Sequence, residues 1–114
     1  MNKNSEFKEY IVNDALHHLE NIRIKAMFGG YGIYWHDVFV AIIAENELYT
    51  KVTPKLKEKY RQQGLHPFCY EQGNHGFTEM NYINVPQEIL DEPQLIKERF
   101  HEAYQIAVAS KKTR

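Results

Sequence analysis

The chain has 114 residues, of which 43% are hydrophobic and 25% charged, and its formal net charge is −1. A chain of this length builds one core, so we expect a single domain over residues 1–114 with an ordered part at about 5–110. The near-zero charge excludes a general attraction to phosphate backbones. The one cysteine, Cys69, excludes an internal disulfide. No run of about 18 apolar residues marks a membrane span, so we expect a cytoplasmic protein.

The first segment with a regular pattern is a predicted amphipathic helix from about Ser5 to Asn21. Apolar residues recur there at the spacing of helix turns, and Asn4 or Ser5 is placed to cap the first turn. The positions that share this stripe are Phe7, Ile11, Val12, Ala15, Leu16, Leu19 and Ile22. We therefore expect a helix with one buried face.

Four predicted strands follow in succession, because their apolar residues alternate or form short runs rich in strand formers. The gaps between them leave room only for hairpins. We expect an antiparallel meander whose third strand, apolar on both faces, is central. The strands are Ile24–Phe28, Tyr31–Trp35, Val38–Ala44 and Leu48–Val52, and the turns are Gly29-Gly30, His36-Asp37 and Glu45-Asn46-Glu47.

The second half of the chain is predicted to contain a short helix, a strand pair and a long final helix. Proline suits the first turn of a helix, glycine suits its end, and the proline of Val85-Pro86 ends the strand pair. The helix order and strand order together predict an α+β fold, with helices flanking a mainly antiparallel sheet. The ranges are Thr53-Pro54 to Gly64, Phe68–Tyr70 with Phe77–Ile83 around the loop Glu71–Gly76, and about Asp91 to Ser110.

Three of the six glycines, Gly29, Gly30 and Gly32, lie within four positions. A dinucleotide-binding fingerprint needs G-x-G-x-x-G before a helix, and a phosphate loop needs G-x-x-x-x-G-K-[ST]. The three glycines fit neither spacing, and a predicted strand follows them. We interpret the cluster as a tight turn with close backbone packing. The alternative is a loop that binds a small ligand.

The residues that often carry catalysis or metal binding are scattered in this sequence. His17 and His18 are adjacent instead of four positions apart, and His66 with Cys69 supplies only two ligands. Cys69 lies on a predicted strand between aromatic residues, which is typical of a small core residue. No serine, cysteine or carboxylate pair has a recognisable catalytic partner. The sequence therefore predicts no enzyme activity, no metal site and no cofactor.

The densest basic run in the chain follows the fourth predicted strand and is interrupted only by one glutamate. Such a run is usually a solvated helix face. The alternative is a surface that contacts nucleic-acid phosphates. The residues of this candidate nucleic-acid interface are Lys51, Lys55, Lys57, Lys59 and Arg61.

Two stretches of the chain carry recognisable motifs. The first stretch is Ala26–Tyr34, followed by an apolar strand and Leu48–Val52. The second is Met80–Pro86, followed by the helix entry Asp91-Glu92-Pro93. Together they resemble the N-terminal domain of the TfoX/Sxy family of bacterial competence regulators, and the similarity covers roughly Lys8 to Val108. The family motif in the first stretch consists of Met27, Phe28, Gly29, Gly30, Tyr31 and Gly32.

The resemblance implies a secretion-chaperone-like α+β fold and a non-enzymatic regulatory role. Longer members of the family promote the expression of DNA-uptake genes together with the cyclic AMP receptor protein, and they append a second, helical domain. This chain ends at Arg114 without that domain, so we expect either a stand-alone member or a piece of a longer one. We expect a homodimeric protein-interaction module whose partners include the cyclic AMP receptor protein or RNA polymerase. The rival interpretations are a direct nucleic-acid binder that uses the basic run and, third, a small-ligand-binding domain.

Overall fold

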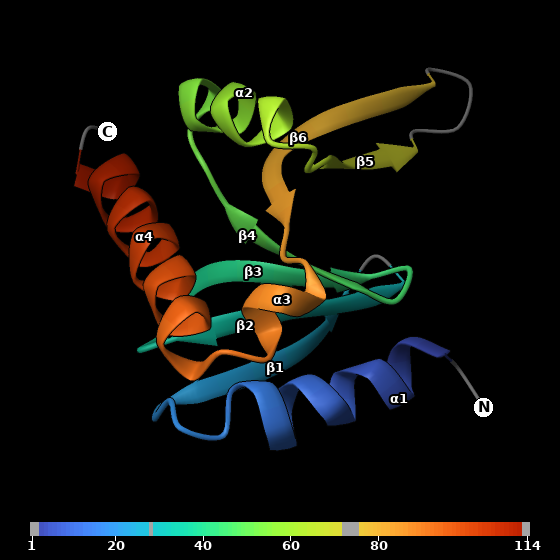
Figure 1. Ribbon diagram of the computed structural model, residues 1–114, viewed down its shortest axis with the longest axis vertical. Helices are drawn as coiled ribbons and strands as arrows, with labels where there is room; N and C mark the ends of the chain where they lie inside the picture. Colours follow the sequence, from blue (N-terminus) through green and yellow to red (C-terminus); the bar gives the residue numbers. More distant parts are fainter. Residues whose placement is uncertain (1–2, 28, 72–75, 113–114) are drawn as a thin grey trace.

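The computed structural model describes residues 3–27, 29–71 and 76–112. These residues form helices and a six-stranded antiparallel sheet, so the predicted α+β fold is confirmed (Figure 1). The helices are α1 (Lys3–Tyr10), continued by a π-helical turn (Ile11–Ala15), α2 (Pro54–Gln62), α3 (Gln87–Leu90) and α4 (Pro93–Lys112). The strands are β1 (Ile22–Met27), β2 (Gly30–Trp35), β3 (Val38–Ala44), β4 (Glu47–Lys51), β5 (Pro67–Glu71) and β6 (Phe77–Asn84).

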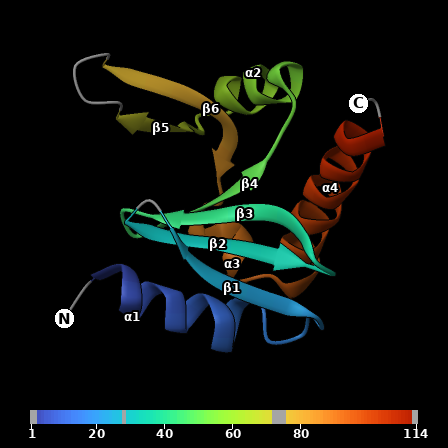
Figure 2. The ribbon, with the colours of Figure 1, turned by 180° about the vertical axis from the view of Figure 1, so that it is seen from behind.

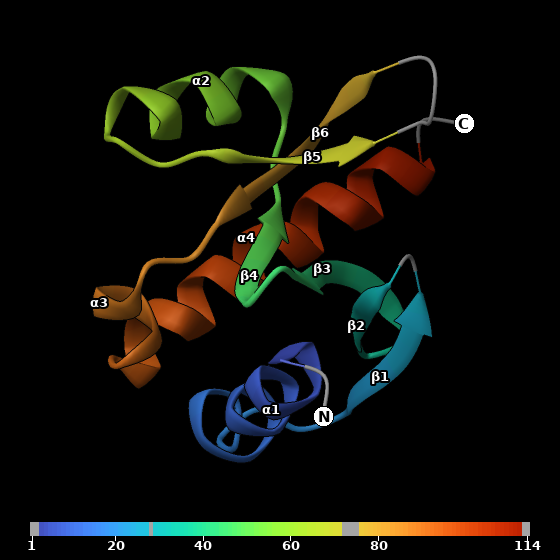
Figure 3. The same cartoon turned by 90° about the vertical axis from the view of Figure 1, so that its right-hand side faces the viewer.

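The strand order is β1-β2-β3-β4-β6-β5, with every neighbouring pair antiparallel. The first four strands form the predicted meander, and β6 then pairs with β4 through Tyr49 and Asn84, which are register partners. The β5–β6 hairpin is therefore added to the far edge of the meander. In side view, β4 lies between β3 and β6, with α1 at one end of the sheet and α2 at the other (Figure 3).

Two of the meander turns are two-residue loops that need left-handed backbone conformations. His36 and Asp37 have φ values of 51° and 63°, and Glu45 and Asn46 have values of 52° and 63°. Two successive residues with positive φ are typical of the type I′ turn, whose twist matches that of the flanking strands. Glu47 already pairs with Ala44, so the third turn is one residue shorter than the sequence predicts.

The predicted first helix ends earlier than expected. The Leu16 N–H donates to the carbonyl oxygen of Ile11 at 2.8 Å, a spacing of five residues that closes a π-turn. Helical structure then stops at Ala15 instead of Asn21, and His17 and His18 lie in the following turn. The prediction also missed α3, whose four residues follow directly after Pro86.

The sheet buries apolar residues on both of its faces. Ile43 and Leu48, which are register partners, belong to a core cluster that includes residues of α1, α3 and α4. Ile42 and Tyr49 are the adjacent register partners and point to the opposite face, into a second cluster built from strand residues. Seen from behind, β2 and β3 lie in front of α3 (Figure 2).

The prediction that Cys69 is a core residue is wrong, because its side chain is exposed. Its neighbour Phe68 is buried in the second cluster. Side chains alternate between the faces of a strand, so β5 points Phe68 inward and Cys69 outward. The adjacent aromatic residues are therefore on the other face from the thiol.

Candidate binding groove

The glycine motif sits at the first hairpin of the sheet. Met27 and Gly30 are register partners at the ends of β1 and β2, so the turn lies between them. Gly29 in this turn has a φ of +73°, which glycine adopts without strain. Phe28 lies outside the described residues. Tyr31 is half-buried on β2, where the ammonium group of Lys8 lies 5.3 Å from the centre of its ring.

Gly30 and Gly32 are positions of close approach within β2. A Cβ atom at Gly30 would collide with the backbone carbonyl oxygen of Ile43. A Cβ atom at Gly32 would lie 2.7 Å from Met27 Cε and 2.7 Å from Phe39 Cε1. The two glycines therefore let strand and side chains pack against the β2 backbone, and the motif shapes the sheet at this end.

The basic run is divided between two surfaces. Lys57 and Arg61 point toward β6, where each lies 2.8 Å from a different carboxylate oxygen of Glu79. Lys57 is buried, and the two cations lower the pKa of Glu79, Arg61 having the larger effect. On the other side of α2, Lys55 and Lys59 are exposed. The five cations predicted as one interface are thus not equivalent.

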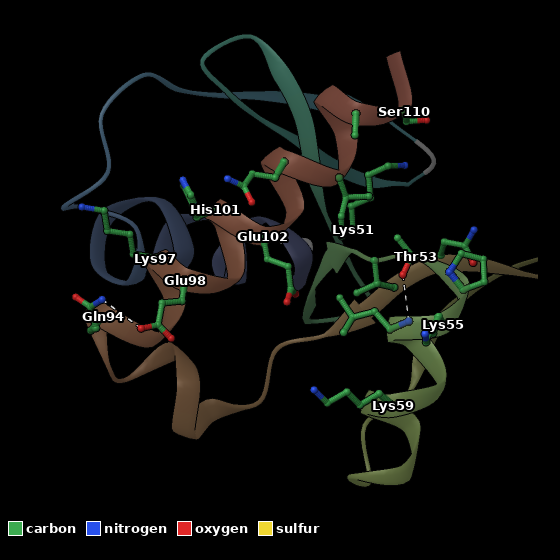
Figure 4. A pocket seen from close by; sticks show the side chains of 17 residues that line it. Lys51, Thr53, Lys55, Lys59, Gln94, Lys97, Glu98, His101, Glu102 and Ser110 are labelled. Atoms are coloured by element: carbon green, nitrogen blue, oxygen red, sulfur yellow. Dashed lines mark hydrogen bonds between the residues drawn. The ribbon is translucent and has the colours of Figure 1, made fainter. Parts of the chain in front are cut away.

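Lys55 and Lys59 line an open groove of about 1240 Å³ between α2 and α4 (Figure 4). This volume exceeds the roughly 300–1,000 Å³ of a typical small-molecule site. The floor comes from the end of β4 and from Asn81 of β6. The lining residues are Lys51, Val52, Thr53, Pro54, Lys55, Leu56, Lys59, Asn81, Gln94, Lys97, Glu98, His101, Glu102, Gln105, Ile106, Ala109 and Ser110.

The α2 wall of the groove begins where the helix begins. The Thr53 hydroxyl accepts a hydrogen bond from the Leu56 N–H at 3.1 Å, which is the expected capping arrangement. Pro54 follows at the first helical position, as the sequence predicts. The positive end of the helix dipole therefore opens into the groove beside Lys55 and Lys59.

The α4 wall carries a stripe of residues three or four positions apart, from Gln94 to Ser110. Glu98 accepts a hydrogen bond from Gln94 Nε2 at 3.3 Å. Glu102 accepts from the Tyr60 hydroxyl of α2, at 3.0 and 3.2 Å to its two oxygens. The Tyr60–Glu102 contact ties the two walls together beneath the opening.

A buried cation lies behind this contact. Arg99 is only 4% exposed, and its Nη1 donates to the Thr50 hydroxyl at 3.1 Å. The guanidinium lies 4.4 Å from the centre of the Tyr60 ring, an arrangement typical of a cation–π contact. Burial lowers the pKa of Arg99 and raises the pKa of Tyr60. Its positive charge is weakly screened at this depth.

The sequence indicated only one of the two walls of the groove. The basic run marked the α2 wall, but nothing in the sequence analysis pointed to Lys97, Glu98, His101 or Glu102 on the other wall. One signal was present: Ile106 is an apolar residue outside the stripe that α4 buries. A single apolar residue of this kind is common on protein surfaces, so it does not identify the groove without the structure.

His17, His18, His66 and Cys69, which were weighed as metal ligands and set aside in the sequence, are not among the residues that line this groove. His66 Nε2 lies 2.7 Å from a Glu47 carboxylate oxygen, and His18 Nε2 lies 3.1 Å from the Pro93 carbonyl oxygen. Within residues 3–27, 29–71 and 76–112, no three His, Cys, Asp or Glu side chains are grouped to hold a metal ion. Across the same ranges, no helix has the length and apolar character needed to cross a membrane.

The fold and the groove define a small α+β domain with one open interhelical surface. The family model described as the TfoX N-terminal domain matches residues 14–107. The match covers most of the 114 residues, and the chain belongs to this family of regulatory, competence-related domains. No curated protein matches the chain.

Proposed function

We propose that the chain is a non-enzymatic regulatory domain that binds a protein partner through the α2–α4 groove, in the transcriptional control of DNA-uptake genes. Family membership supports the regulatory and competence-related part of the proposal. The observation that supports protein binding is the groove itself, which is open, lined by apolar residues such as Leu56 and Ile106, and larger than a small-molecule site.

The direct test is binding to purified components. The tagged chain is incubated with the cyclic AMP receptor protein or RNA polymerase of its source organism, and retention is measured by pull-down and by a change in sedimentation. We expect one of them to be retained by the wild type and lost with Ile106→Asp, which places a charge in the groove. Retention of neither protein contradicts the proposed partners.

The control variant for this test is Lys25→Glu, which changes a charge on β1, outside the groove lining. Both variants are first compared with the wild type by thermal unfolding, since Ile106 is half-buried. If Lys25→Glu and Ile106→Asp reduce retention equally, binding does not use the groove.

A second candidate function is direct nucleic-acid binding, favoured by the exposed Lys55 and Lys59 and by Lys51 and Lys97 on the same groove. It predicts that the affinity for a DNA duplex falls steeply as salt is raised. It also predicts that Lys55→Gln with Lys59→Gln weakens binding and reduces the salt dependence. Titration at low salt that shows no binding excludes this candidate.

A further inference from the structure

We propose that the occupant of the α2–α4 groove is a single amphipathic helix of a partner protein, with an apolar face toward the groove and carboxylates along the side that faces α2. This inference rests on the proposed function and names the chemistry of the partner. It is an example of helix-in-groove recognition, in which an apolar helix face fills a hydrophobic channel.

The shape of the groove fits a helix. Its α4 wall runs from Gln94 to Ser110 with a lining residue on every turn. At a rise of about 1.5 Å per residue, this wall is roughly 24 Å long, which accommodates a helix of about four turns. The α2 wall is shorter and runs from Pro54 to Lys59, so a partner helix that lies along α4 would contact α2 over part of its length.

The floor of the groove is apolar at the end where α2 meets α4. Val52 is buried, Leu56 and Ile106 are half-buried, and Pro54 and Ala109 are exposed beside them. These side chains come from the segment that follows β4, from α2 and from α4. Apolar residues three and four positions apart on a partner helix would cover them and remove their surface from water.

The charges around the groove are asymmetric. Lys55 and Lys59 lie one turn apart on α2, the positive end of the α2 dipole adds to them, and Lys51 continues the basic side. The α4 wall is mixed, because Lys97 lies on it together with the two carboxylates of the groove, Glu98 and Glu102. Both carboxylates accept hydrogen bonds, Glu98 from Gln94 and Glu102 from Tyr60. Arg99 adds a positive charge behind that wall.

This arrangement favours acidic residues on the α2 side of the occupant. The groove and its rear wall hold five cationic side chains against two carboxylates, in a chain whose formal net charge is −1. The excess of positive charge is therefore confined to the groove. Complementary negative charge on the partner raises the association rate and favours this partner over others.

Nucleic acid and a second copy of the chain fit the groove less well. A phosphate backbone gains nothing from Leu56 and Ile106, and Glu98 and Glu102 on the α4 wall repel it. The main apolar faces of α1 and α4 are already packed in the first core cluster, so neither of these two helices of a second copy has a free apolar face to insert.

The test uses three fluorescent peptides of about 16 residues that share one apolar face of leucine and alanine at helical spacing. They differ in one flank, which carries glutamate, glutamine or lysine. Binding to the full chain is measured by fluorescence anisotropy. We expect the glutamate peptide to bind about tenfold more tightly than the lysine peptide, as several exposed ion pairs allow, and this preference to shrink as salt is raised.

Charge reversal on the protein gives the sharpest comparison. Lys55→Glu combined with Lys59→Glu is expected to invert the order, so that the lysine peptide binds more tightly than the glutamate peptide. Ile106→Asp is expected to weaken binding of all three peptides, and Lys25→Glu to change none. Equal affinities for the three peptides, or an unchanged order after charge reversal, overturn the inference.

Two further measurements separate this inference from the alternatives. Displacement of the glutamate peptide by a single-stranded DNA of similar length would overturn it in favour of nucleic acid. Self-association that Ile106→Asp abolishes would overturn it in favour of a second copy. If the receptor protein or polymerase is retained while no peptide binds, the inference fails and the proposed function stands. If the peptide binds as expected while neither protein is retained, the proposed partners fail instead.

Discussion

Three alanine substitutions in the glycine motif should differ widely in their effect on stability. At Gly29 φ is +73°, and among the described residues no atom beyond its chain neighbours lies within 4 Å of an added Cβ. The left-handed backbone costs an alanine there about 1–2 kcal/mol. The smaller freedom of alanine in the unfolded chain offsets about 0.4–1 kcal/mol of this. Gly29→Ala should therefore lower the free energy of unfolding by only about 1 kcal/mol.

Gly30→Ala should be the most damaging of the three. Its Cβ atom meets the Ile43 carbonyl oxygen, which is backbone in the next strand and cannot rotate away, so β2 and β3 must separate locally. We expect a loss of at least about 3 kcal/mol, at the upper end of overpacking effects. Gly32→Ala should be intermediate, at about 1–2 kcal/mol, because its Cβ meets side chains instead of backbone. The end of Met27 is flexible and can move aside, while the ring of Phe39 must shift.

The assay is equilibrium unfolding in urea, followed by the fluorescence of Trp35. This tryptophan is the only one in the chain and is buried, with its Nε1 donating to the Glu20 carbonyl oxygen at 2.9 Å, so unfolding changes its environment. Unchanged m-values across the series would show that the same surface is exposed in each variant. A Gly29→Ala loss equal to or larger than that of Gly30→Ala would refute the interpretation of Gly30 as a close-approach position.

Three further predictions follow from the described contacts. Glu79→Gln removes the carboxylate that Arg61 and Lys57 share and should lower the free energy of unfolding by about 1 kcal/mol after allowance for solvent screening. Because the pKa of Glu79 is lowered in the folded state, the stability that its carboxylate contributes is present above its ordinary pKa of 4.5 and is lost as the pH falls through the lower folded value. The free energies of unfolding of wild type and variant, measured in urea, should therefore converge at low pH. A difference between them that stays constant with pH would contradict this. Burial raises the pKa of Tyr82 to about 12, so an ultraviolet titration of Tyr82→Phe should show one fewer tyrosine that ionises at high pH. The stability that this tyrosine contributes to the wild type is lost as the pH rises from about 10 to about 12. Asn46→Gly should raise the free energy of unfolding by up to about 1 kcal/mol, because glycine relieves a φ of 63° in a type I′ turn, and a lower thermal midpoint would count against the turn assignment.

Local patterns predicted most of the elements of the fold correctly. The alternation of β2, the continuous apolar run of β3, the dipeptide His36-Asp37 and the start signal Thr53-Pro54 are short-range features. The structure shows strands, a turn and a helix at these places. The early end of the first helix was not predictable in this way, because the apolar stripe continues beyond Ala15 while the Leu16 N–H bonds five residues back instead of four. The π-turn redirects the chain toward β1 without a change in the apolar pattern.

The candidate groove was harder to predict because it is a tertiary feature. Lys55 and Lys57 look equivalent in the sequence, yet one is exposed and the other is buried against Glu79. Which side of α2 faces β6 depends on how the β5–β6 hairpin joins β4, and that pairing connects Tyr49 with Asn84. The pairing of β4 with β6 also places α2 on the opposite side of the groove from α4. The sequence therefore indicated the basic side chains without indicating which of them share a surface with Glu98 and Ile106.

The connectivity of the sheet has a consequence for the order in which the protein folds. The pairs β1–β2, β2–β3 and β3–β4 join neighbours in the chain through very short turns, and local contacts of this kind form early. The pairing of β4 with β6 and the packing of α4 on β3 and β4 join segments that are much further apart in the chain. Because such contacts form later, we expect α2 and α4 to dock last. Native-state hydrogen exchange should then show faster opening in α2, whose one buried residue is Lys57, than in β2 and β3. A ligand bound in the groove would contact both helices and slow this local opening. Binding could therefore be detected as slower amide hydrogen exchange, even if the average structure did not change.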